Sequence, residues 1–101
     1  MDQQEQVAAF LADHEMEAPL PYRLLDLASE VGELSKEATT STDYGAEPES
    51  IAIADDEIGD ALFALLSVAE AADVDADEAL QQSLAKYERR IEETGEAGSG
   101  E

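Results

Sequence analysis

The chain has 101 residues, of which 44% are hydrophobic, and its 26 acidic side chains against five Lys and Arg give a net charge of −21. This length suits one domain with a single core, and the absence of cysteine excludes disulfides and thiolate metal sites. The acidic excess argues against partners that need clustered Lys and Arg, namely nucleic acids and anionic membranes. The sequence contains no run of about 18 apolar residues, so no membrane-spanning helix is predicted. The polar, acidic start is unlike a signal peptide, so we expect a cytoplasmic protein.

The excess of acids is itself typical of a protein from a salt-rich cytoplasm. At molar salt the Debye length is only about 3 Å, so a strongly acidic surface repels itself much less than in dilute buffer. An acidic residue in this sequence therefore indicates a site only where its position is unusual.

Apolar residues recur at helical spacing in four segments, which predicts an all-α domain over residues 1–93 and a disordered acidic tail over 94–101. We expect the helices over about residues 2–15, 21–39, 48–72 and 75–93. The lone histidine, His14, ends the apolar stripe of the first helix. A packed side chain is the more ordinary role there, because general-base chemistry needs a positioned partner.

One short phrase occurs twice: Glu30-Val31-Gly32-Glu33-Leu34 returns as Glu57-Ile58-Gly59-Asp60-Ala61. Carboxylates at i and i+3 share a helix face, where a like-charge pair costs roughly 0.2–0.5 kcal/mol. A hard cation such as Mg²⁺ reverses that sign because carboxylate oxygens bind it. Glycine inside a helix costs about 1 kcal/mol relative to alanine, which calls for a packing or ligand reason. We hypothesise that Glu30, Glu33, Glu57 and Asp60 form one metal site.

The two pairs of carboxylates differ in how strongly they indicate a metal site. The first lies in a longer acidic stripe that also contains Asp26 and Glu37, and such a stripe is most often a solvated face. The second precedes residues 61–72, which are apolar almost all round and therefore predict a helix buried on most sides. We expect Glu57 and Asp60 at the rim of this covered region, where carboxylates are costly unless they are paired, protonated or metal-bound.

The segment after the third helix resembles a calcium loop only in its alternating aspartates. Glu78 stands where an EF-hand loop needs glycine, and Leu84 where it needs glutamate, so an EF-hand is not expected. Asp75 instead predicts the cap of the fourth helix.

A basic cluster on the fourth helix, here defined as Lys86, Arg89 and Arg90, holds three of the five basic residues. Two interpretations stay open. The cluster complements the negative end of the helix dipole and the neighbouring Glu92 and Glu93, or it binds an anion such as phosphate.

Taken in order, these patterns resemble the MazG-like branch of the all-α nucleoside triphosphate pyrophosphohydrolases. The resemblance covers roughly residues 24–91 and is carried by Leu27-Ala28-Ser29-Glu30-Val31-Gly32-Glu33-Leu34, Asp56-Glu57-Ile58-Gly59-Asp60-Ala61-Leu62-Phe63 and Lys86-Tyr87-Glu88-Arg89-Arg90. It implies a four-helix antiparallel bundle, completed by oligomerisation as a homodimer or a dimer of dimers. It also implies Mg²⁺-dependent hydrolysis of a nucleoside triphosphate to monophosphate and pyrophosphate, with Mn²⁺ as an alternative metal.

The same resemblance implies roles for single residues. It implies four metal ligands that are also the catalytic acids, namely Glu30, Glu33, Glu57 and Asp60. It also implies that the substrate is bound by Lys86 and Arg90, with Arg89 beside them. Two departures accompany the resemblance. Many members of that family carry paired acids just before the middle of the first motif, where this chain has Ser29, and an asparagine shortly before the basic cluster, where this chain has Leu84.

A non-catalytic helical interaction module with a salt-adapted surface remains an alternative. A di-iron bundle is set aside, because it needs Glu-x-x-His pairs on two helices and the chain has one histidine. The sequence does not choose which carboxylate acts as general base, Glu33 being one candidate, whether one or two ions bind, or which nucleotide is preferred.

Overall fold

The computed structural model describes residues 2–96 and 98, and all regular structure among them is helical. The elements are α1 (Asp2–Asp13), α2 (Leu20–Ser41), the 3-10 turn η1 (Pro48–Ser50), α3 (Asp55–Ala71) and α4 (Ala76–Thr94). The predicted all-α class with four helices is thereby confirmed.

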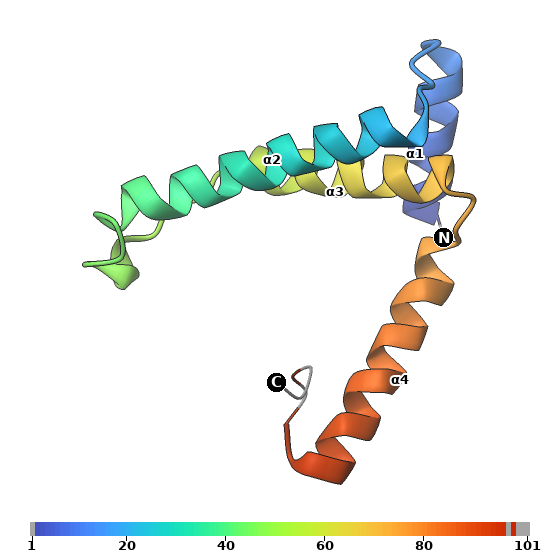
Figure 1. Ribbon diagram of the computed structural model, residues 1–101. Coiled ribbons are helices and arrows are strands. Elements are labelled where there is room, and N and C mark those ends of the chain that lie inside the picture. The colour runs from blue at the N-terminus through green and yellow to red at the C-terminus, as the bar shows by residue number, and fades with distance from the viewer. Residues whose placement is uncertain (1, 97, 99–101) are drawn as a thin grey trace.

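Three of the helices pack together, and the fourth stands apart. Helices α2 and α3 lie side by side in opposite directions, α1 packs on α3 near its C-terminal end, and α4 turns away from that end (Figure 1). The described residues of one chain therefore do not close a bundle around all four helices. No helix within the described part is long and apolar enough to cross a membrane.

The helix α3 begins at Asp55, seven residues later than we expected. The four residues that follow η1 form no helix, because they are tied to the end of α2. The backbone N–H of Ala52 donates to the Ser41 hydroxyl at 3.0 Å, and that of Ala54 donates to the Glu37 carboxylate at 3.5 Å. The later start places Glu57 in the first turn of α3, near the positive end of the helix dipole.

The core lies where α1 and α2 meet the middle and C-terminal part of α3. Its buried apolar residues are Leu11, Ala64, Leu66 and Ala69. Beside them, the Ser67 hydroxyl donates to the Phe63 carbonyl at 2.8 Å. The apolar segment of α3 is thus covered on the sides that face α1 and α2. Leu62 and Leu65 remain 45% and 50% exposed, so a further side is uncovered in one chain.

A buried glutamine fixes the point where α4 leaves the other helices. The Gln4 side chain donates to the Val74 carbonyl at 2.8 Å and to the Glu70 carboxylate at 2.9 Å, and it accepts from the Ala76 N–H at 2.7 Å. The contacts join α1 to both sides of the turn between α3 and α4.

The two ends of α4 have regular caps. The Asp75 carboxylate accepts from the N–H groups of Asp77 and Glu78 at 2.9 and 3.1 Å, which confirms the predicted cap. Gly95 ends the helix with a φ of 79°, a left-handed conformation that glycine adopts without strain. Half of the tail predicted to be disordered, namely residues 97 and 99–101, lies outside the described residues.

Candidate functional site

Three of the four predicted metal ligands meet between α2 and α3. Glu30 on α2 and both Glu57 and Asp60 on α3 each offer a carboxylate oxygen, and these oxygens lie within 4.8 Å of one another. The side chains of Glu30 and Glu57 are half-buried, and that of Asp60 is exposed. Because the two helices run side by side, the repeated motifs face each other although they are 27 residues apart in the sequence.

The donor set fits a hard divalent cation. Carboxylate oxygens suit Mg²⁺, Mn²⁺ and Ca²⁺ better than softer metals. Two oxygens on opposite sides of Mg²⁺ are about 4.2 Å apart, twice its usual bond length of about 2.1 Å. The observed spacing therefore needs only small side-chain movements to take such an ion.

The acids act on one another through their charges. The pKa of Glu57 is raised above its ordinary value, first by partial desolvation and then by the negative charges of neighbouring acids, which are Glu37, Asp56, Asp60 and Glu33. Glu33 is exposed and is not one of the three residues that meet, although its charge still reaches Glu57. A bound cation relieves this repulsion.

Glu37 also belongs to the surroundings of the site, although it was not predicted to lie there. Its carboxylate accepts the Ala54 N–H bond just before α3, and among the neighbouring charges it is the foremost influence on the pKa of Glu57. The sequence spacing could have indicated this position, because Glu37 lies two turns beyond Glu30 on the same face of α2.

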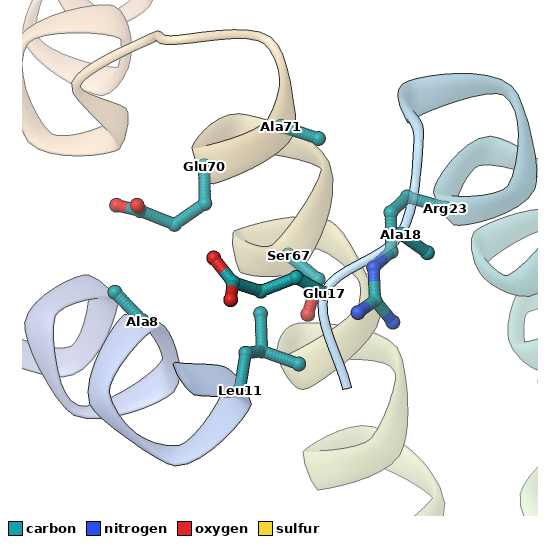
Figure 2. A pocket seen from close by; sticks show the side chains of 8 residues that line it. All are labelled: Ala8, Leu11, Glu17, Ala18, Arg23, Ser67, Glu70 and Ala71. Atoms are coloured by element: carbon teal, nitrogen blue, oxygen red, sulfur yellow. The ribbon is translucent and has the colours of Figure 1, made fainter. Parts of the chain in front are cut away.

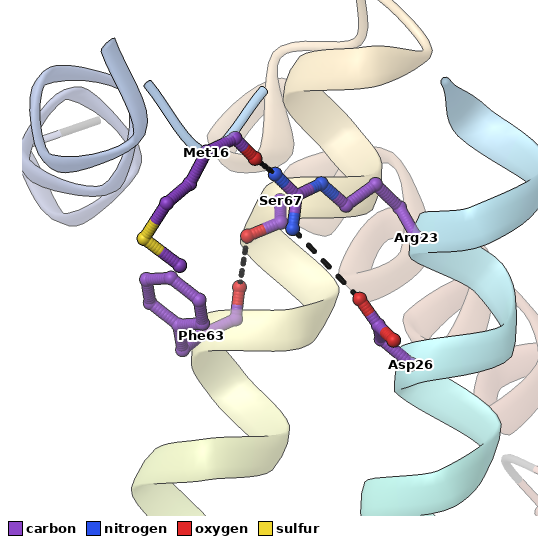
Figure 3. A network of polar contacts seen from close by, with 5 residues as sticks. All are labelled: Met16, Arg23, Asp26, Phe63 and Ser67. Carbon is purple, nitrogen blue, oxygen red and sulfur yellow. Dashed lines mark hydrogen bonds and ion pairs between the residues drawn. The ribbon is translucent and has the colours of Figure 1, made fainter. Parts of the chain in front are cut away.

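A cavity of about 240 Å³ adjoins the three acids. It is lined by Met16, Arg23, Asp26, Ser29, Glu30, Asp60, Phe63, Ala64 and Ser67. Arg23 is buried, donates from its guanidinium to the Met16 carbonyl, and lies 3.8 Å from the Asp26 carboxylate (Figure 3). Arg23 was not predicted to belong to the site, although it lies seven residues before Glu30 and so on the same helix face.

A second cavity of about 190 Å³ shares Arg23 and Ser67 with the first. Carboxylates of Glu17 and Glu70 lie around it (Figure 2). It contains none of the three acids that meet.

The basic cluster lies away from the acids in one chain. The Lys86 ammonium is 4.9 Å from the centre of the Tyr87 ring, and Arg90 donates to the Gly98 carbonyl at 3.3 Å. The described residues form one ion pair, Arg23–Asp26, so no member of the basic cluster pairs with an acid among them. The 12 residues from Asp60 to Ala71 span about 16 Å of helix, and α4 follows that far end.

The position of the basic cluster within α4 also bears on its two interpretations. None of its residues lies in the last turn of the helix, and the stabilising effect of the dipole on a cation is confined to about that turn. The anion interpretation is therefore favoured.

The glycines of the repeated motif have no packing reason inside one chain. A Cβ atom built on Gly32 or Gly59 meets no atom within 4 Å. Of the two reasons expected for these glycines, packing or a ligand, packing is thus absent among the described residues.

Comparison with known proteins adds the family. The family model described as MazG nucleotide pyrophosphohydrolase domain matches residues 22–96, which include both acidic motifs and the basic cluster. No curated protein and no solved structure matches. Since the match covers most of the chain, this protein belongs to the MazG nucleotide pyrophosphohydrolase domain family.

Proposed function

We propose that this protein hydrolyses nucleoside triphosphates to the monophosphate and pyrophosphate, with Mg²⁺ as its metal and Mn²⁺ as a substitute. The observation that carries the proposal is the meeting of Glu30, Glu57 and Asp60 within 4.8 Å in a chain of this family. Those three residues hold the cation, and Glu33 is the fourth acid of the site.

The chemistry follows from charge. When bound, Mg²⁺ neutralises phosphate oxygens and makes water a stronger nucleophile at neutral pH. The water oxygen forms a bond to phosphorus, the anhydride P–O bond breaks, and pyrophosphate leaves. A carboxylate of the cluster takes the water's proton. Glu33 is our candidate, because it is not among the three acids that meet.

The catalytic unit in this proposal is a homodimer or a dimer of dimers, in which a second copy covers α4. Large apolar residues of α4 recur along one stripe and are 41–51% exposed: Leu80, Leu84, Tyr87 and Ile91. A cavity of about 350 Å³ with mostly apolar lining separates α4 from α3. Burying one large apolar side chain is worth about 1.5–3 kcal/mol, so a partner surface here gains several such contributions.

A second copy also supplies what one chain lacks at the acids. Lys86 and Arg90, with Arg89 beside them, contact the phosphates from the neighbouring copy. Support comes from their separation from the acids within one chain and from the absence of acidic partners for them among the described residues. Arginine and lysine are the standard partners of phosphate oxygens.

The products test the reaction. Each of the common nucleoside triphosphates is incubated with the protein and Mg²⁺ in H₂¹⁸O at molar KCl and followed by ³¹P NMR. We expect monophosphate and pyrophosphate in equal amounts, with one ¹⁸O in one of them. Glu57→Gln should lose this turnover, and Glu49→Gln, an exposed acid of η1, should keep it. Formation of diphosphate and phosphate, or no turnover with Mg²⁺ or Mn²⁺, would contradict the proposal.

A further inference from the structure

We propose that the 240 Å³ cavity beside the acids binds the base of the nucleotide, and that Arg23 and Asp26 select a base with both a carbonyl oxygen and an amino group. Cytosine and guanine are the common bases of this kind. The inference rests on the proposed function, because it takes the phosphates to lie at the acids.

Size and position assign a part of the nucleotide to this cavity. Sites for whole drug-sized ligands measure about 300–1,000 Å³, so a cavity of about 240 Å³ suits one moiety. Glu30 and Asp60 form part of its wall and also belong to the acidic cluster. A nucleotide held there by its phosphates therefore has its nucleoside end next to the cavity.

The walls of the cavity suit the flat face of a base. The Phe63 ring and the Met16 side chain lie together on one side (Figure 3). Every base can stack on an aromatic ring, so this side of the cavity adds affinity without selecting one base over another. The cavity of about 190 Å³ on Arg23 has no aromatic residue in its lining and does not reach Glu30 or Asp60 (Figure 2).

The polar side of the cavity supplies selection. At 3.8 Å, the Arg23–Asp26 pair is too long for a hydrogen bond, so both groups keep bonding capacity for a ligand. The guanidinium has five donor hydrogens. Its buried position is fixed by the bond to the Met16 carbonyl, whereas the Asp26 side chain is 65% exposed and accessible.

A donor and an acceptor side by side match a particular base edge. Arginine pairs with the carbonyl oxygen of guanine, and a carboxylate accepts from the amino group of cytosine. A base that carries both groups can bridge Arg23 and Asp26. Uracil and hypoxanthine lack the amino group, and adenine lacks the carbonyl oxygen.

The test compares substrates that differ at the amino group. We expect kcat/KM for CTP over UTP, and for GTP over ITP, to be about 10-fold to 100-fold higher, the usual range for one well-made base contact. Asp26→Asn should reduce both ratios mainly through KM, because an amide both donates and accepts. Asp43→Asn is the matched control, since Asp43 lies in a loop at a φ of 51° that asparagine also tolerates. Arg23→Lys keeps the charge but loses the planar pair of donors, and it should lower kcat/KM for both members of each pair with little change in the ratios, because both members carry the carbonyl oxygen.

The outcomes separate this inference from the proposed function. Equal kcat/KM within both substrate pairs in the unmodified protein overturns the base assignment and leaves the hydrolase standing. If no triphosphate is hydrolysed, the proposed function fails, and thermal-shift titrations with CMP and UMP decide the inference. Tighter binding of CMP that Asp26→Asn abolishes supports it, and equal binding, or none, overturns it.

Discussion

Removing one carboxylate from the acidic cluster should abolish most of the stabilisation that Mg²⁺ gives. The substitution Glu30→Gln keeps the size of the side chain and removes one charge from the three that meet. A divalent ion and a carboxylate about 3 Å apart attract each other by about 2.8 kcal/mol in water. That energy corresponds to roughly a 100-fold weaker dissociation constant.

The expected shifts in melting temperature follow from that ratio. At a Mg²⁺ concentration of about 100 times its dissociation constant, the unmodified protein gains about 2.7 kcal/mol, and a variant that binds 100-fold more weakly gains about 0.4 kcal/mol. For a domain of this size, 1 kcal/mol moves the midpoint by about 4–8 °C. The midpoint should therefore rise by roughly 11–22 °C in the unmodified protein and by roughly 2–3 °C in Glu30→Gln.

The assay is thermal unfolding followed by circular dichroism, with MgCl₂ compared against NaCl of equal ionic strength. The NaCl reference removes the general screening of a chain with a net charge of −21. Glu49→Gln, which removes an exposed charge from η1, should respond like the unmodified protein. An equal Mg²⁺ response in Glu30→Gln, or no response in any of the proteins, would refute the reasoning.

Three further predictions concern the basic cluster, the free stripe of α4 and the acidic cluster. Lys86→Ala should raise KM for triphosphates by about tenfold or more, since a hydrogen bond to a charged group is worth about 1.5–3 kcal/mol, and Lys36→Ala on α2 serves as its control in steady-state kinetics. Leu84→Asp should convert the oligomer to a monomer in sedimentation velocity, with Gln81→Asp on the same helix as control. Glu57→Gln should raise the metal-free melting temperature near pH 8 at low salt, and hardly change it near pH 4.

The sign of the last prediction follows from the raised pKa of Glu57. A carboxyl group whose pKa is raised by folding favours the fold below its ordinary pKa, and this contribution is lost as the pH rises through the raised value. The uncharged amide avoids that loss, so the gain grows with pH and shrinks at molar salt. A gain that is the same at both pH values argues against charge as its cause. An unchanged KM in Lys86→Ala, or an unchanged mass in Leu84→Asp, argues against the roles proposed for those residues.

Local patterns were enough to predict the helices and one of their caps. The spacing of apolar residues predicted four helices, and Asp75 was correctly predicted to cap the last one. These features depend on residues a few positions apart, which the sequence displays directly. The repeated motif also predicted that acids of α2 and α3 share one site, and the structure brings Glu30, Glu57 and Asp60 together.

Features that depend on contacts between distant residues could not be predicted. The late start of α3 depends on bonds from Ala52 and Ala54 to side chains at the end of α2. The departure of α4 depends on Gln4, whose partners lie more than 60 residues away. The sequence around Arg23 is that of an ordinary helix, because only the packing against α3 buries this side chain near the acids.

The central claim is that two neighbouring helices hold their carboxylates around one hard cation. Crystals grown with Mn²⁺ and measured at an energy where manganese scatters anomalously test it directly. We predict one strong anomalous peak coordinated by Glu30, Glu57 and Asp60. A map without density between these three residues, with their oxygens turned toward bulk solvent, would contradict the metal site and the hydrolase built on it.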